Sequence, residues 1–381
     1  MRMESSTVNL LSSTPTLSLE NPTQFSRPVT VLAAVAACIF TVVGVVGNLF
    51  TVVALIKCAK LRTHATTTFV ISLAASDLLF SSINLPLTAC RYIHEEWLLG
   101  DTLCRLYPVL FYGNVGVSLM NMVAITLNRY VLISCPGTYP KIYSRMNILL
   151  MVAGVWIFSF GLLLPPLLEI WGTLGLDPPT FSCTVLKDSE GRSPKKFLFL
   201  FGFLLPCVAI IVCYSAIFYR VRQSRLNVQK HIGLEGRRNK ESALQSSQKK
   251  EDLRMTKMML IIFLSFLICF LPLMLVNVID DEMAVPTLHV VASVLAWMSS
   301  VINPFIYAFK NRQYKQAFKK LLCVYQRVDQ PVSRPGASQA SGQSKQSASK
   351  TFITEMLQYN AGQEKIKMVS QQKGRSMAEN E

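Results

Sequence analysis

Seven long apolar stretches run along the chain, separated by polar segments. Each is long enough to cross a bilayer, because a spanning helix needs about 20 mostly apolar residues. The apolar positions are continuous and do not alternate, which favours helices over the strands of a membrane barrel. The stretches cover residues 29–56, 66–91, 104–134, 147–168, 196–219, 257–279 and 286–309. The pattern therefore predicts an all-α membrane protein, with a seven-transmembrane helix bundle over residues 29–310.

The segment after the seventh stretch has an amphipathic pattern. Tyr314, Phe318 and Leu321 recur at helical spacing with lysines between them. This spacing predicts a short eighth helix over residues 311–323 that lies on the membrane surface. Cys323 at the end of this helix is a candidate for palmitoylation, and an unmodified thiol fits the sequence equally well.

Lysine and arginine are concentrated in alternate polar segments. The loops after the first, third and fifth stretches and the segment after the seventh are basic, whereas the loop after the sixth is acidic and the loop after the fourth is mixed. Because basic loops face the cytoplasm, we expect a multi-pass plasma-membrane protein with an extracellular tail at residues 1–28. Residues 324–381, rich in Ser, Gln, Lys and Gly, are expected to form a disordered cytoplasmic tail.

The composition fits a membrane protein and excludes several other classes. Of the 381 residues, 51% are hydrophobic and 16% are charged, against about 25% charged residues in soluble domains. The net charge of +16 falls in short loops and not on one folded surface, which argues against nucleic acid as a partner. There is no Cys-x-x-Cys pair and the four histidines are scattered, so neither a redox dithiol nor a metal centre is indicated.

Polar side chains within the apolar stretches mark function or helix packing, and three of them lie in three different stretches. They are Asn48, Asp77 and Asn303, and Asp77 is the only acid inside the apolar part of its stretch. Asp77 is either a cation or proton site or a hydrogen-bonded packing residue. We favour the first interpretation, because a carboxylate within a membrane needs a partner and marks function more often than packing.

Each stretch also carries a short motif, and the order of the motifs is informative. They are Gly47-Asn48, Leu73-Ala74-Ala75-Ser76-Asp77, Cys104 with Asn128-Arg129-Tyr130, Trp156, Pro206 with Tyr214, Phe266 with Cys269-Phe270-Leu271-Pro272, and Asn303-Pro304-Phe305-Ile306-Tyr307. One such motif is weak, but seven in order on seven separate stretches are specific. Over residues 29–323 the chain resembles the rhodopsin-like (class A) G-protein-coupled receptors.

The resemblance implies a receptor that binds an extracellular ligand and activates a heterotrimeric G protein, and not an enzyme. It further implies arrestin and a receptor kinase as partners of the Ser-rich tail, and no cofactor except a possible sodium ion. An intramembrane hydrolase would need histidine at membrane depth, but the histidines lie in or near loops. A transporter would need unwound helices around a midplane site, whereas the prolines here bend helices without unwinding them.

The same resemblance assigns a switching role to Arg129, at the end of the third helix. Most relatives have an acid before this arginine, whereas Asn128 carries no charge that could pair with it. Asp252, at the start of the sixth helix, is expected either to hold the arginine instead or to be a solvated loop charge. The other switch residues implied by the resemblance are Tyr130, Tyr214, Phe270 (where the family usually has Trp), Pro272, Asn303, Pro304 and Tyr307.

A sodium site and a disulfide are also implied by the resemblance. A hard cation takes oxygen ligands, and the expected set is Asp77, Asn114, Ser118, Ser299 and Asn303. The disulfide is expected between Cys104 and Cys183, which both fall on the extracellular side of the predicted topology, where disulfides persist.

The ligand pocket is expected between the outer halves of the helices. Its candidates by helix position are Phe111, Tyr112, Phe270, Asn277, His289 and Trp297. This aromatic lining suggests a lipid or other hydrophobic small molecule, although core packing gives the same composition. Amine receptors have Asp where this chain has Phe111, and without that carboxylate a monoamine ligand is not expected.

The segment "NRYVLISCPGTYPKIYSR" indicates a subgroup. It most resembles the arthropod trapped-in-endoderm and moody receptors, which implies a role in cell migration or in epithelial or glial polarity. The melatonin receptors are a more distant resemblance and remain an alternative. They usually have Ala at the position of Pro304.

Overall fold

The computed structural model describes residues 25–62, 64–232, 240–279 and 285–328. The chain divides into two compact units, residues 1–325 and 326–381, and the first unit contains the helix bundle. Both expected tails lie largely outside the described residues, as does the side chain of Cys323. The expectations about disorder and palmitoylation therefore remain predictions.

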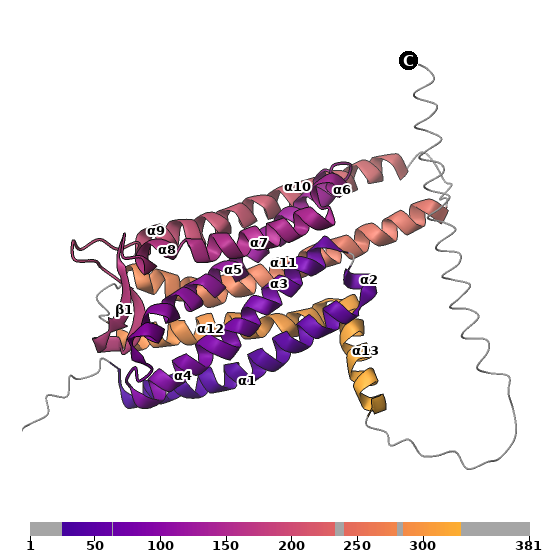
Figure 1. Cartoon of the computed structure of the whole chain (residues 1–381). Helices are drawn as coiled ribbons and strands as arrows, with labels where there is room; N and C mark the ends of the chain where they lie inside the picture. Colours follow the sequence, from indigo (N-terminus) through magenta and orange to yellow (C-terminus); the bar gives the residue numbers. More distant parts are fainter. Residues whose placement is uncertain (1–24, 63, 233–239, 280–284, 329–381) are drawn as a thin grey trace, which may run out of the picture. The chain divides into compact units, whose positions relative to one another are not determined.

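The predicted bundle is present. Six helical runs within the described ranges are long and apolar enough to cross a membrane, and a seventh apolar helix has 17 residues. The long helices run side by side (Figure 1). They are α1 (Arg27–Lys57), the run α3 (Ala65–Leu79), η1 (Phe80–Asn84) and α4 (Leu85–His94), α5 (Gly100–Ser134), α7 (Arg145–Gly161), the run α9 (Lys195–Phe199), η3 (Leu200–Leu204) and α10 (Leu205–Ile232), α11 (Lys240–Ile279) and α12 (Pro286–Lys310).

The fourth helix is shorter than predicted. We expected it to extend to residue 168, but α7 ends at Gly161 and a separate short helix, α8, covers Leu164–Leu167. The reason is the pair Pro165 and Pro166, which have no amide hydrogens for the carbonyl groups of residues 161 and 162. The helix therefore stops one turn before the prolines.

Two π-helical turns lie directly before prolines. The turn η1 precedes Pro86, and η3 precedes Pro206. Each proline leaves the carbonyl four residues earlier without a helical partner and would clash with it in a regular helix. A wider turn relieves this clash and re-aims the helix that follows, so these prolines shape the outer halves of two helices.

A β-hairpin that the sequence analysis did not predict lies at one end of the bundle (Figure 1). Strands β1 (Thr173–Asp177) and β2 (Ser182–Leu186) are antiparallel, with Leu176 opposite Cys183. The predicted disulfide joins Cys183 to Cys104 on α5. We call this end of the bundle, with the hairpin at residues 173–186, the hairpin end.

The opposite end carries three short elements: α2 (Ala59–Arg62), α6 (Tyr139–Ile142) and α13 (Arg312–Val328) (Figure 1). We call it the Arg129 end. Helix α13 is longer than the predicted eighth helix, and its apolar face is used differently. Tyr314 is fully buried against Tyr307, and Phe318 lies 5.2 Å from Phe50 between ring centroids. Part of the face expected to contact the membrane surface therefore packs on α12 and α1.

Large apolar side chains also cover outward faces of the bundle. Examples are Val42 on α1, Ile157 on α7 and Val212 on α10, which are all more than half exposed. Exposed apolar surface of this extent has no place in water and fits contact with lipid. The polar side chains discussed below are buried between the helices.

Candidate functional site

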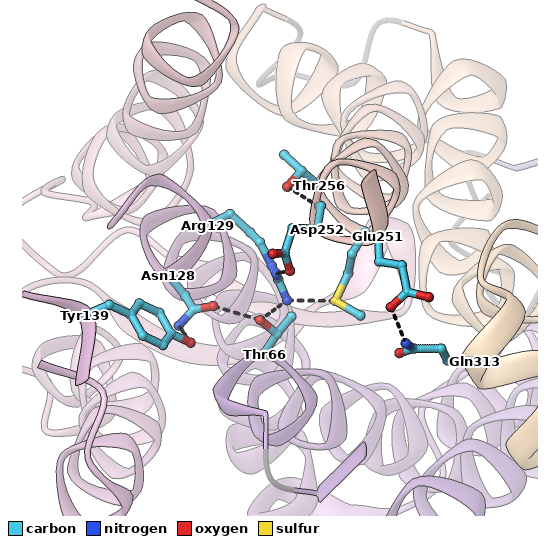
Figure 2. A network of polar contacts seen from close by, with 9 residues as sticks. Thr66, Asn128, Arg129, Tyr139, Glu251, Asp252, Thr256 and Gln313 are labelled. Atoms are coloured by element: carbon cyan, nitrogen blue, oxygen red, sulfur yellow. Dashed lines mark hydrogen bonds and ion pairs between the residues drawn. The ribbon is translucent and has the colours of Figure 1, made fainter. Parts of the chain in front are cut away.

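Arg129 lies at the end of α5, inside the bundle and almost fully buried (Figure 2). Its guanidinium donates hydrogen bonds to the Thr66 hydroxyl on α3 and, at 2.7 Å, to the Met255 sulfur on α11. A carboxylate oxygen of Asp252 on α11 lies 3.4 Å from its Nη1. The arginine thus connects the third, second and sixth membrane helices at the Arg129 end.

Asn128 extends this network to α6. The Thr66 hydroxyl accepts from Arg129 and donates to Asn128 Oδ1 at 2.7 Å, and Asn128 Nδ2 donates to the Tyr139 hydroxyl at 3.1 Å. These bonds form a chain from Arg129 to Tyr139 (Figure 2). The ring of Tyr139 stacks on that of Tyr143. Burial raises the pKa of the Tyr143 hydroxyl to about 12, and the neighbouring phenol of Tyr139 adds to this shift. Thr66 was not among the predicted residues, and nothing in the sequence marks it.

Asp252 is the acid that the structure brings to Arg129. Its side chain is 38% exposed, whereas that of Arg129 is 4% exposed. The pair is therefore half solvated, and its contribution should be modest. The neighbouring acid, Glu251, accepts a hydrogen bond from Gln313 at 3.2 Å and so connects α11 to α13 (Figure 2).

The other predicted switch residues occupy different surroundings. Tyr130 is only partly buried and has no hydrogen bond to the Arg129 network in the part of the chain that is described. Tyr214 packs from α10 against the buried core, and Tyr307 is fully buried beside Tyr314. Pro272 lies inside α11.

Pro304 creates a contact between α1 and α12. A proline has no amide hydrogen for the carbonyl four residues earlier, which here belongs to Ser300. Asn48 Nδ2 donates to that carbonyl at 2.8 Å and to the Gly44 carbonyl at 3.0 Å. The buried asparagine therefore satisfies a backbone group that the proline left without a helical partner.

Asp77 is buried in the middle of the bundle and is fully engaged. Ser118 Oγ donates to one carboxylate oxygen at 2.9 Å, and Asn303 Nδ2 donates to the other at 2.8 Å. Ser118 also lies 3.3 Å from the hydroxyl of Ser76. The second, third and seventh membrane helices thus meet at one carboxylate.

A small cavity of about 10 Å³ lies beside Asp77, enough for about one water-sized species. Asn114, Ser118 and Ser299 line it, and Asn114 Oδ1 is a buried oxygen without a hydrogen-bond partner. Ser299 donates to the Ala296 carbonyl, so a hydroxyl lone pair remains. Carboxylate, amide and hydroxyl oxygens are the ligands of a hard cation, so these residues fit a sodium ion.

At the hairpin end, a cavity of about 160 Å³ brings together five of the six predicted pocket residues. These are Phe111, Tyr112, Asn277, His289 and Trp297. Phe270 is the exception, because it is fully buried, stacks on Phe266 and lines the small cavity beside Asp77. Phe270 therefore does not line the cavity that holds the other five residues, and it faces the small cavity beside Asp77 instead.

The lining is less apolar than we expected. Arg91, Asp177 and Lys195 all contribute to this cavity. Arg91 lies on α4 near the hairpin end and is 8% exposed. Arg91 was not among the predicted pocket residues. A single arginine at the predicted outer end of a span could have marked it, because it departs from the rule that cations collect on the inner side.

Contacts around the mouth hold the hairpin over this cavity. Phe181, at the hairpin turn, packs on Tyr92 and Phe25 with ring centroids 5.7 and 5.3 Å away. Arg27 pairs with Glu95 at 2.9 Å. Hydrogen bonds from Thr30 and then Arg27 lower the pKa of the Glu95 carboxyl.

Comparison with known proteins supports what this arrangement suggests. Residues 47–307 match the family described as "7 transmembrane receptor (rhodopsin family)". The chain belongs to the rhodopsin family of seven-transmembrane receptors. This family consists of receptors and not of enzymes, so the hydrolase and transporter alternatives are set aside, and its fold is that of a multi-pass plasma-membrane protein.

Individual relatives of this receptor agree with the predicted subgroup. "Protein trapped in endoderm-1" of Drosophila melanogaster is 50% identical, with 85% of each chain covered. "G-protein coupled receptor moody" of the same species is 36% identical over 88% of this chain and 58% of its own length. "Melatonin receptor type 1B-B" of Danio rerio is 31% identical over 78% of this chain and 84% of its own.

A solved structure shares the fold of this receptor. The crystal structure of squid rhodopsin matches with a TM-score of 0.71, covering 81% of this chain and 89% of that one. The sequence identity is 24%, so the likeness concerns the fold. It agrees with the predicted seven-helix bundle.

Proposed function

We propose that the protein binds an extracellular ligand in the cavity at its hairpin end and promotes nucleotide exchange on a heterotrimeric G protein at its Arg129 end. The N-terminus is then extracellular and the C-terminus cytoplasmic, as the basic loops indicate. Moody and the melatonin receptor are both named as receptors, which supports a signalling role. The family implies the G protein as partner.

The observation that carries this proposal is the pairing of two sites at opposite ends of the bundle. The buried Arg129 network lies at one end, and the ligand-sized cavity lies at the hairpin end. Around Arg129 lies a hollow of about 1030 Å³, lined by α5, α11, α12 and the start of α13. The arginine is held by partners on two other helices and is withdrawn from solvent. This arrangement is what a resting receptor needs, because separating α11 from α5 would release the guanidinium toward a partner in the hollow.

The test is guanine-nucleotide exchange by a purified G protein in the presence of receptor membranes. Arg129→Ala should abolish exchange, since it removes the group that would contact the partner. Arg145→Ala is the matched control, because Arg145 is an exposed arginine at the start of α7. Full exchange by Arg129→Ala, at equal surface expression, would contradict the proposal.

A sodium ion at Asp77 is proposed as a resting-state ligand. Asp77, Asn114, Ser118 and Ser299 line the small cavity and would supply oxygen ligands, and the ion would neutralise the carboxylate. The fifth predicted residue, Asn303, does not line this cavity and presents its amide nitrogen to Asp77. Sodium should then lower basal exchange relative to potassium in the parent, and Asp77→Asn should lose this difference. Equal sodium sensitivity of basal exchange in the parent and in Asp77→Asn would contradict a sodium site at Asp77.

The biological role is proposed from the subgroup. The similarity to protein trapped in endoderm-1 and to moody supports the expected subgroup. On the resemblance to that subgroup, we propose a part in cell migration or in epithelial or glial polarity. Arrestin and a receptor kinase are proposed partners of the Ser-rich tail. Loss of the receptor should impair migration or barrier integrity in the cells that express it, and unaltered cells would argue against this role.

A further inference from the structure

The chemistry of the cavity at the hairpin end suggests which ligand it takes. We propose that this ligand is an amphiphile with one anionic head group, bound at Arg91, and an apolar tail that enters a second, adjoining cavity. The inference rests on the proposed function, since it concerns the ligand of that same receptor.

Arg91 is a buried cation without an acidic partner. Its Nη2 donates to the Tyr92 hydroxyl at 3.3 Å, and its Cζ lies 4.4 Å from the Tyr92 ring centroid. Its Nε is buried and has no hydrogen-bond partner. Within the described residues, no carboxylate forms an ion pair with it. Burying a charge in this way is costly unless an opposite charge arrives.

The other charged side chains of the cavity are compatible with one bound anion. Lys195 adds a second positive side chain to the lining. Among the described residues, Asp177 is the one carboxylate of the lining, and it accepts a hydrogen bond from Thr180 at 2.6 Å. Because no described carboxylate pairs with Arg91 and Asp177 is engaged by Thr180, an anionic group is the expected occupant beside Arg91. A carboxylate or a phosphate would present the oxygens that a guanidinium binds in pairs.

A second cavity, of about 140 Å³, would hold the apolar tail. It shares Tyr112, Thr184, Lys195 and Asn277 with the first, so the two cavities adjoin. Away from this shared wall, it is lined by uncharged residues that include Leu162, Leu163, Phe199, Phe203, Met274 and Val278. At the wall, the hydroxyls of Tyr112 and Thr184 are 3.5 Å apart, a weak contact that a ligand could displace.

The size and lining of each cavity fit one part of such a molecule. A head group beside Arg91 would satisfy the unpartnered Nε. A chain of methylene groups in the second cavity would be removed from water, which favours binding in proportion to its apolar area. The first cavity suits the anionic head group and the second suits the apolar tail, so the proposed ligand would occupy both.

The test uses the full-length receptor in lipid nanodiscs, with four twelve-carbon probes that differ only in the head group. These are dodecanoate, dodecyl phosphate, dodecanol and dodecylammonium, and binding is measured as a ligand-dependent rise in Tm. Either anion should raise Tm, and the stronger one identifies the head group. The proposal is overturned if dodecanol raises Tm as much as both anions do, because the charge of the head group would then not contribute to binding. It is also overturned if dodecylammonium raises Tm most, because a cationic head group would then bind at Asp177.

Two variants separate head from tail. Arg91→Gln should weaken binding of the anions by at least about tenfold, because a charge-assisted hydrogen bond is lost, while Arg105→Gln, an exposed arginine of the same end, should not. Gly202→Leu places a side chain in the second cavity, where a Cβ would meet only Leu162 at 3.8 Å. It should weaken dodecanoate much more than hexanoate, whereas the exposed Gly154→Leu should change neither.

Binding in nanodiscs does not need a G protein, so this inference and the proposed function can fail separately. Anion binding without nucleotide exchange would keep the ligand class and reject the coupling. Basal exchange that depends on Arg129, with no binding of either anion, would keep the coupling and reject the ligand class.

Discussion

Arg129 and Arg91 are both buried arginines, at opposite ends of the bundle, and their surroundings differ. Arg129 has a carboxylate within 3.4 Å and a hydroxyl and a thioether that accept from its guanidinium. Arg91 contacts the hydroxyl and ring of Tyr92, and no carboxylate of the described residues forms an ion pair with it. A buried charge must be compensated, so the first is compensated by its own chain and the second by a molecule from outside. The contacts of Arg129 with Thr66, Asp252 and Met255, which we call the latch, hold the helices of the receptor together. The surroundings of Arg91 are those of a binding site.

The two ends also differ in what holds them together. A disulfide ties the hairpin to α5, whereas the described contacts of Arg129 are hydrogen bonds and a half-exposed ion pair. The predictions below test this difference, beginning with the largest effect.

Removing the disulfide should have the largest effect. The double variant Cys104→Ser and Cys183→Ser should lower the free energy of unfolding by about 2–5 kcal/mol, the usual range for a native disulfide. It should also abolish ligand binding, because the cavity loses its cover. The control is Cys135→Ser, an exposed free cysteine of the Arg129 end. A double variant with the Tm of the parent would show that packing alone holds the hairpin.

Weakening the latch should have an intermediate effect. Asp252→Ala leaves Arg129 without its carboxylate, and basal nucleotide exchange should rise about fivefold, the equivalent of about 1 kcal/mol for a half-exposed pair. Glu251→Ala, the adjacent acid that contacts Gln313 instead, is the matched control. If both variants signal equally, Asp252 does not act through Arg129.

Strengthening the latch should have a smaller effect of opposite sign. Asn128→Asp keeps an acceptor for Thr66 and adds a carboxylate beside Arg129, so basal exchange should fall about two- to fivefold because charge-assisted bonds are stronger. The decrease should disappear at acid pH as the new carboxylate protonates, whereas Asn128 in the parent cannot titrate. Basal exchange measured across pH tests both points, and an unchanged value at every pH would contradict them.

Glu95 should contribute the least. Its pKa is lowered in the folded protein by Thr30 and Arg27, so its stabilising effect is present above the unfolded pKa and is lost as pH falls through the folded pKa. The Tm of the parent should therefore approach that of Glu95→Gln as pH falls below about 4.5. A constant difference in Tm from pH 7 to pH 3 would rule out an electrostatic contribution.

The comparison also shows what sequence reasoning can find. Arg129 and Asp77 are recognisable because each interrupts a long apolar run, and hydrophobicity is a local property of the chain. Asp252 is harder to assign from the sequence, because an acid at the start of the sixth helix also fits a solvated loop charge. Thr66 was missed because it is one of many threonines, and its role depends on lying opposite Arg129.

The chain's hydrophobic pattern by itself determined the seven membrane helices, and its motif order determined the receptor family. Both follow from properties that neighbouring residues share. Only the tertiary structure decided that Phe270 lies beside Asp77, that Thr66 joins Asn128 to Arg129, and that no carboxylate among the described residues forms an ion pair with Arg91. These facts depend on helix rotation and on the angle at each proline-associated turn. Such geometry is set by packing between segments far apart in the sequence, which no local pattern encodes.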